Sequence, residues 1–244
     1  MAKVKFKNYF KEDLVGILEN GLPGPIVILM HGFCANKDEN GLFKECAEYF
    51  SAHNINTMRF DVSGTGESSG DYQESTIRKQ ASELNSAIEY LGAPRNIGLV
   101  GFSLGAAVAL CSSNPNICAY SFWSPAFFPS KDMLPRYDTL ANNESLKNRG
   151  YFENRGLRIG LEMLNDLRNF DATDFLSSIV SPIQVVHGTE DPRISYESSI
   201  KVMDVINSGK ELVLIEGANH SYKDNEDHRK QVFEKSCEWF KKYL

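Results

Sequence analysis

Short apolar segments alternate along the chain with segments in which apolar residues recur every three or four positions. The clearest uninterrupted run is Pro25–Met30, which is typical of a strand buried on both faces of a parallel sheet. Similar runs predict further strands at Ile55–Phe60, Asn96–Val100, Ala119–Trp123, Ile183–Val186 and Leu212–Ile215. Strands that alternate with helices indicate βαβ units, so we expect an α/β fold with a mostly parallel central sheet flanked by helices.

The intervening segments carry the apolar spacing of amphipathic helices. This spacing predicts helices over about 42–50, 77–91 and 232–240, and an Ala-rich run, Ala106–Leu110, predicts another. The start of the chain, Val4–Asn20, instead predicts two short strands that turn near residues 11–13.

The segment Ser124–Ser178 breaks the alternation. It separates two neighbouring strand predictions by more than fifty residues, which is too long for a simple crossover. We therefore expect residues 124–178 to form an inserted cap on a core domain of residues 1–123 and 179–244. Within the cap, Tyr151–Arg158 predicts a small hairpin, and a helix is expected from about Ile159 to Asn169.

Composition and charge exclude several classes of function. The formal net charge is −6 and no cluster of Lys and Arg is present, which disfavours nucleic-acid binding. No apolar run approaches the length of a membrane span, and the charged N-terminus lacks a signal-peptide core, so we expect a cytoplasmic protein without membrane insertion. The five cysteines lack C-x-x-C spacing and predict neither a disulfide framework nor a metal site.

A candidate nucleophile follows the strand predicted at Asn96–Val100. Ser103 lies in Gly101-Phe-Ser-Leu-Gly105, between that strand and the Ala-rich helical run. A serine in a tight strand-to-helix turn projects its Oγ away from the backbone, and flanking glycines avoid clashes in the crowded turn. By itself the pattern also fits an ordinary turn bounded by glycines, but its context favours a nucleophile.

A serine hydroxyl needs a base, and His220 is the candidate. It lies in the loop after the strand predicted at Leu212–Ile215, at the carboxyl edge of the sheet where ligands bind. His31 and His187 end strands, and for that reason we expect structural roles for them. His53 ends a predicted helix, where a favourable interaction with the helix dipole explains its presence without a catalytic role.

The acid that orients the imidazole is expected between the serine and the histidine in the chain. Asp191 meets this condition in the loop after the strand predicted at Ile183–Val186, and the adjacent Glu190 is the alternative. An oxyanion needs two amide donors. The N–H of Leu104 follows the nucleophile directly, and the N–H of Phe33, in the loop after Pro25–Met30, is the second candidate.

In their order along the chain, these motifs resemble the α/β-hydrolase superfamily. Further matches are the stretches His31–Asp38 and Arg59–Gly70; the latter lacks the spacing of a phosphate-binding loop. Within the superfamily the chain is similar to small bacterial cinnamoyl and feruloyl esterases and to serine-aminopeptidase-like relatives. The resemblance implies a Ser-His-Asp triad, an oxyanion hole and a cap, and it leaves the substrate open.

We expect a carboxylic-ester hydrolase that works through an acyl-enzyme on aromatic, hydroxycinnamoyl-like or short-to-medium acyl esters, without cofactor. Substrate contacts are expected from Cys34, Phe127, Phe128 and Tyr151. Thioesterase, lipase-like and aminopeptidase activities on the same residues remain alternatives, as does a non-catalytic ligand-binding protein. The expected partner is a small-molecule ester, and the sequence leaves the oligomeric state open, a homodimer included.

Overall fold

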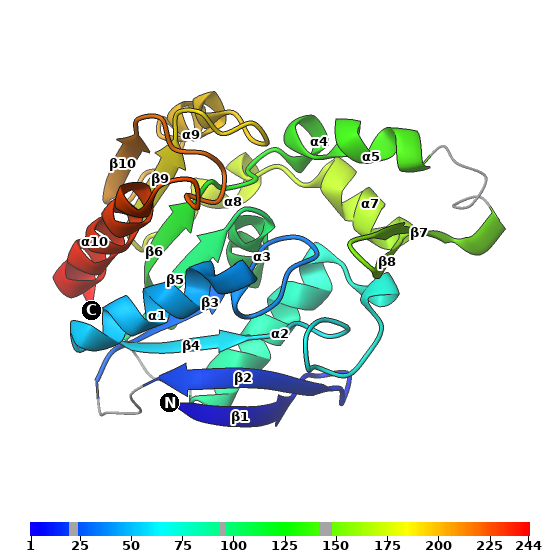
Figure 1. Cartoon of the computed structure of the whole chain (residues 1–244), viewed down its shortest axis with the longest axis horizontal. Helices are drawn as coiled ribbons and strands as arrows, with labels where there is room; N and C mark the ends of the chain where they lie inside the picture. Colours follow the sequence, from blue (N-terminus) through cyan, green and yellow to red (C-terminus); the bar gives the residue numbers. More distant parts are fainter. Residues whose placement is uncertain (20–23, 93–95, 142–147) are drawn as a thin grey trace.

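A twisted, mostly parallel sheet forms the centre of the protein (Figure 1). The computed structural model describes residues 1–19, 24–92, 96–141 and 148–244, and for 138–141 the backbone only. The sheet has the order β1-β2-β4-β3-β5-β6-β9-β10. Its strands are β1 Ala2–Lys7, β2 Asp13–Glu19, β3 Ile26–Met30, β4 Asn56–Phe60, β5 Ile97–Phe102, β6 Ile117–Trp123, β9 Ile183–Gly188 and β10 Lys210–Ile215. Strands β1, β2 and β4 pair antiparallel and the other pairs are parallel, which confirms the predicted fold class.

The predicted central strands are buried along their whole length. Every residue of β3, β4, β5 and β9 is buried, because helices cover both faces of the sheet at these strands. Edge strands β1 and β10 are largely exposed. This difference explains why the central strands read as continuous apolar runs.

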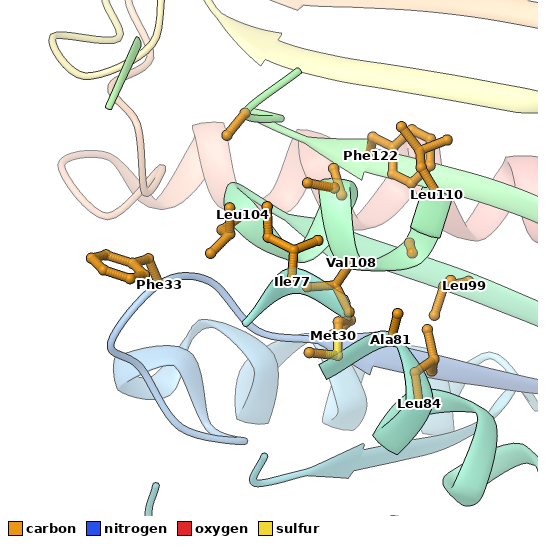
Figure 2. Packing of buried hydrophobic residues seen from close by; sticks show 14 of the residues in the cluster. Met30, Phe33, Ile77, Ala81, Leu84, Leu99, Leu104, Val108, Leu110 and Phe122 are labelled. Carbon is orange, nitrogen blue, oxygen red and sulfur yellow. The ribbon is translucent and has the colours of Figure 1, made fainter. Parts of the chain in front are cut away.

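Helices cover both faces of the sheet. They are α1 Leu42–Ala52, α2 Ile77–Tyr90, α3 Leu104–Ser112, α4 Pro129–Asp132, α5 Leu134–Ala141, α7 Leu161–Asn169, α8 Thr173–Leu176, α9 Tyr196–Val202 and α10 Glu226–Tyr243. Helices α1 and α10 pack together over one face, around buried residues such as Phe50 and Phe240. On the other face, Figure 2 shows Val108 of α3 and Leu84 of α2 beside Leu99 of β5. Helix α3 is thereby fixed with its first residue at the carboxyl end of β5.

The inserted segment, residues 124–178, lies between β6 and β9, which pair directly with one another. Its helices α4, α5 and α7 and the two-stranded sheet β7–β8 are grouped at the right of Figure 1. Strands β7 Tyr151–Asn154 and β8 Leu157–Gly160 confirm the predicted hairpin. The predicted helix begins at Leu161 instead of Ile159, because Ile159 and Gly160 pair with β7.

The five cysteines, Cys34, Cys46, Cys111, Cys118 and Cys237, are free thiols. Within the described ranges, no helix has the length and apolar character needed to cross a membrane. In the same ranges, no three or more His, Cys, Asp or Glu side chains are grouped so that they could hold a metal ion.

Candidate active site

Ser103 occupies a strained turn between β5 and α3. Its φ is 54° and its ψ is −117°, a conformation that non-glycine residues rarely adopt, and its N–H donates to the Trp123 carbonyl at 2.9 Å. The flanking glycines are required by close packing: a Cβ at Gly105 would lie 2.2 Å from the carbonyl oxygen of Met30, and one at Gly101 would lie 2.8 Å from the Cα of Ala106. The turn therefore directs the Ser103 side chain away from the sheet, at the N-terminus of α3.

Three side chains predicted from separate loops form a continuous hydrogen-bonded chain. His220 Nε2 lies 3.2 Å from Ser103 Oγ, and His220 Nδ1 lies 2.6 Å from Asp191 Oδ2. An ionised carboxylate can only accept, so Nδ1 carries the proton and Nε2 is left to accept the proton of the serine hydroxyl. The arrangement can therefore deprotonate Ser103 when its Oγ attacks an electrophile.

The carboxylate of Asp191 is fully inaccessible and fully bonded. Its Oδ1 accepts the main-chain N–H groups of Arg193 at 2.7 Å and Ile194 at 3.0 Å, while Oδ2 faces the histidines. Burial opposes ionisation, but the hydrogen bonds from His187 and His220 outweigh it and hold the pKa of Asp191 well below its usual range. The alternative acid, Glu190, is exposed, so the structure brings Asp191 and not Glu190 to the imidazole.

A second histidine contacts the same carboxylate. His187 Nε2 lies 3.2 Å from Asp191 Oδ2 and 3.1 Å from the carbonyl oxygen of Ile194, and its Nδ1 lies 2.7 Å from Ser199 Oγ. Two acceptors at Nε2 place the proton there, so Nδ1 accepts from the hydroxyl of Ser199. Sequence reasoning treated His187 as structural because it ends a strand; its position four residues before Asp191 is the signal that was missed.

Burial has the largest effect on the pKa of His220, the candidate base. His220 is buried, and desolvation lowers its pKa below 6.5, although the hydrogen bond to Asp191 and the charge of that carboxylate act in the opposite direction. The positive charge of Arg193 also lowers the pKa. The imidazole is therefore neutral near pH 7, as a general base must be.

Two main-chain amides beside Ser103 are available to an oxyanion. Leu104 N–H belongs to the first turn of α3, where no acceptor exists within the helix. Phe33 N–H has no acceptor among the residues that the structure describes. The neighbouring amides of Phe33 are occupied: Gly32 N–H donates to Glu39 Oε2 at 2.8 Å, and Cys34 N–H donates to Tyr72 Oη at 3.2 Å. These bonds fix the loop that carries Phe33, and Figure 2 shows Phe33 on this loop and Leu104 at the start of α3.

A pocket with about 480 Å³ of empty space, its open mouth included, reaches Ser103 and His220. Both the core and the inserted segment supply its wall, whose described members are Gly32, Phe33, Glu39, Phe102, Met133, Arg136, Tyr137, Asn154, Arg155, Arg193 and Ile194. The wall thus combines aromatic and aliphatic surface with three guanidinium groups. Its charged groups were not among the substrate contacts expected from the sequence, which were Cys34, Phe127, Phe128 and Tyr151.

The structure places none of the four predicted substrate contacts in this wall. Phe127 is fully buried against Phe122, and the rings of Phe128 and Tyr151 lie beside the cationic groups of Lys201 and Arg158. Cys34 lies directly behind the wall, where its Sγ accepts from Asn154 Nδ2 at 3.5 Å. Burial raises the pKa of the Cys34 thiol to about 11, so this cysteine stays protonated.

Glu39 is a buried carboxyl in the pocket that sequence reasoning did not single out. Burial raises the pKa of Glu39 to about 7, against the Gly32 N–H bond and the charges of Lys223, Arg155 and Arg193. The sequence signal was its place nine residues after the end of β3, in the connection that also supplies Phe33. At neutral pH this group is close to half ionised.

The arrangement of the whole chain matches solved esterases. The ferulic acid-bound structure of the esterase Est1E from Butyrivibrio proteoclasticus superposes with a TM-score of 0.81 at 21% identity, covering 98% of this chain and 98% of that chain. An esterase from Exiguobacterium antarcticum gives a TM-score of 0.78 at 18% identity, covering 98% of this chain and 100% of that one. At these identities the likeness shows the fold.

Sequence comparison identifies relatives that align with part of the chain. Alpha/beta hydrolase domain-containing protein 17C of Mus musculus is 27% identical over 173 residues, which are 69% of this chain and 46% of that protein. The chain spans about half the length or less of the curated relatives it matches. The match to the family model is more extensive, since it runs over residues 27–234. The chain therefore belongs to the alpha/beta hydrolase family.

Proposed function

We propose that this hydrolase cleaves carboxylic esters through an acyl-enzyme on Ser103. Ser103 Oγ attacks the ester carbonyl carbon and its proton passes to His220 Nε2, while Asp191 holds the imidazole and stabilises its charged form. The oxyanion of the tetrahedral intermediate accepts hydrogen bonds from the N–H groups of Phe33 and Leu104. When the intermediate collapses, the alcohol leaves with the proton from His220. Water then attacks the acyl-enzyme, gives its proton to His220 and releases the acid, and Ser103 regains its proton.

One observation supports the proposal: the hydrogen-bonded chain from Asp191 through His220 ends at Ser103 Oγ, beside two amides that have no acceptor among the residues that the structure describes. A nucleophile, a base and an oxyanion site within one pocket are the parts that acyl transfer requires. The esterase Est1E, whose overall fold is similar, supports esters as the substrate class.

The alternatives differ in the leaving group. An aminopeptidase would have to bind the ammonium group of its substrate, and the guanidinium groups of Arg136, Arg155 and Arg193 around the pocket repel such a cation. Thioesters and lipid esters use the same chemistry and are distinguished by assay. A non-catalytic ligand-binding role predicts no covalent reaction at Ser103.

We further propose that residues 124–178 act as a cap that selects the substrate. Met133, Arg136 and Tyr137 of this segment, together with Asn154 and Arg155 of its hairpin, line the pocket that contains Ser103. A wall built by the inserted segment would set the size and charge of the acyl or alcohol group, while the core domain supplies the chemistry.

The test is the hydrolysis of 4-nitrophenyl esters of increasing acyl length by the wild type and by Ser103→Ala. We expect the substitution to lower kcat by at least about 10³-fold, because the nucleophile is lost while the pocket remains. A fluorophosphonate probe should label the wild type and leave Ser103→Ala unlabelled.

Ser130→Ala is the matched control, because Ser130 is an exposed serine of the inserted segment outside the pocket. It should retain wild-type turnover and labelling, and circular dichroism should show both variants folded. Turnover above a tenth of the wild-type value in folded Ser103→Ala would remove Ser103 as the nucleophile. A wild type that is neither labelled nor active on esters or thioesters would favour the ligand-binding alternative.

A further inference from the structure

Three arginines from separate segments converge on the pocket of Ser103. Arg136 belongs to α5, Arg155 to the turn between β7 and β8, and Arg193 to the loop that follows Asp191. The chain as a whole carries a formal net charge of −6, so this group of arginines has the opposite sign to the net charge. All three residues are exposed, so their guanidinium groups are accessible to a ligand that enters the pocket.

Two of the three guanidinium groups have no hydrogen-bond or ion-pair partner among the residues that the structure describes. Arg136 Nη2 donates to the main-chain carbonyls of Pro192, at 3.3 Å, and Arg193, which ties α5 to the loop of Asp191. By contrast, the side chains of Arg155 and Arg193 form no hydrogen bond or ion pair with any described residue. The arginines that do form ion pairs with described carboxylates are Arg59, Arg158 and Arg229.

Hydrogen bonds fix the main chain of Arg193 beside the pocket, which its side chain lines. The N–H of Arg193 donates to Asp191 Oδ1 at 2.7 Å, and its carbonyl accepts from Arg136. Its charge reaches the catalytic group, since it contributes to the lowered pKa of His220. Arg193 and His220 both line the pocket, so an ester bound there lies near both side chains.

Arg155 occupies a backbone position that disfavours arginine. Arg155 and Gly156 form the two-residue turn of the hairpin, with φ values of 52° and 78°. A turn with two positive φ angles favours Asn followed by Gly, and a long side chain such as Arg is unfavourable at the first position. Strained backbone positions are frequent at ligand-binding sites, and the Arg155 side chain lines the pocket.

The pocket wall holds a single carboxyl among its described residues, Glu39, and it does not neutralise the arginines. Its Oε2 is engaged with Gly32 N–H, and burial keeps the pKa of Glu39 near 7, so its negative charge is only partial at neutral pH. Positive charge therefore predominates at the pocket, carried by three side chains that are exposed to solvent.

We propose that the ester substrate carries an anionic group, and that Arg155 and Arg193 bind it while Ser103 attacks the carbonyl. This inference rests on the proposed ester hydrolysis and adds the substrate class. Guanidinium groups bind carboxylate and phosphate by paired charge-assisted hydrogen bonds, so either group fits the same two side chains. Binding of a remote anion also positions the reacting carbonyl, which increases kcat/KM.

The test compares two esters of equal length that differ in charge. Mono-4-nitrophenyl adipate carries a carboxylate where 4-nitrophenyl hexanoate carries a methyl group. For the wild type we expect a kcat/KM ratio of adipate to hexanoate of at least about 10. In the double variant Arg155→Asn with Arg193→Gln the ratio should fall about tenfold or more. Asn suits the turn, and the Arg193 N–H bond to Asp191 is preserved, so the variant should fold.

Arg168→Gln is the matched control, because Arg168 is exposed on α7 and lies outside the pocket wall. Its ratio should equal that of the wild type. A wild-type ratio of 1 or less, or a double variant that keeps the wild-type ratio within about threefold, would overturn the anion assignment.

Binding without catalysis separates this inference from the proposed function. Calorimetry with Ser103→Ala should show binding of adipate, and of inorganic phosphate if the natural anion is a phosphoryl group. Binding should be lost when Arg155→Asn and Arg193→Gln are added. If neither ester is hydrolysed but this arginine-dependent binding is observed, the ester function fails and the anion site stands. If the esters are hydrolysed but neither anion binds, the anion site fails alone.

Discussion

The buried carboxyl of Glu39 makes the stability of the protein depend on pH in a specific direction. Its pKa is about 7 in the folded protein, against 4.5 for an ordinary glutamate. The folded state therefore holds this proton more tightly than the unfolded chain. The stabilisation from Glu39 is complete below pH 4.5 and is lost as the pH rises through about 7.

The perturbation is Glu39→Gln, which keeps a carbonyl oxygen to accept the Gly32 N–H bond and removes the ionisation. The difference between 4.5 and about 7, at about 1.4 kcal/mol per pH unit, corresponds to about 3 kcal/mol. The free energy of unfolding of Glu39→Gln relative to the wild type should thus increase by about 2 to 3 kcal/mol between pH 5 and pH 8.

Urea unfolding followed by tryptophan fluorescence at the two pH values measures this difference. Subtracting the free energy of unfolding of the wild type from that of Glu39→Gln removes the contributions of titrating groups that both proteins share. The matched control is Glu190→Gln, whose carboxyl is exposed, and its difference from the wild type should be the same at both pH values. If the difference for Glu39→Gln is also independent of pH, Glu39 is not a buried titrating group and the reasoning is refuted.

The remaining predictions concern the candidate catalytic groups. Asp191→Asn should lower kcat by about 10²- to 10⁴-fold, because the imidazole loses its acceptor, whereas Glu190→Gln should change kcat little; steady-state kinetics showing the reverse order would transfer the role to Glu190. Because burial lowers the pKa of His220, the pH profile of kcat/KM should have its midpoint below pH 6.5. The profile is best measured in Glu39→Gln, where residue 39 does not titrate, and a midpoint above 6.5 in this variant would contradict the prediction. His187→Leu should reduce kcat about tenfold or more and raise that midpoint, whereas His187→Gln, which keeps a donor, should restore part of both; an unmoved midpoint would leave His187 a packing role.

The sequence alone predicted most of the fold, because the strands that position the site are buried on both faces. Burial on two faces requires an unbroken apolar run, which is visible without a structure at Ile26–Met30 and Ile97–Val100. Helix boundaries were less accurate: α10 begins at Glu226, although the apolar spacing marks only 232–240, because its exposed first turns carry no apolar pattern. Helix α9 had no predicted counterpart.

Ser103, Asp191 and His220 could also be selected from the sequence, and the structure brings their side chains within hydrogen-bonding distance. Each follows a strand of the parallel part of the sheet, and the carboxyl ends of parallel strands meet at one edge of the sheet, so order along the chain was sufficient. The two glycines around Ser103 are local requirements of one turn and are visible for the same reason.

Only the tertiary structure decided what surrounds these residues. The contact of His187 with Asp191, the place of Glu39 in the pocket and the convergence of Arg155 and Arg193 each depend on how loops and the inserted segment fold back over the sheet. The aromatic residues predicted to touch substrate pack elsewhere instead. Periodicity reports which face of an element is buried, but it does not report which distant loop lies opposite. The charge of a pocket is the sum over such loops, so it emerges only when the chain is folded.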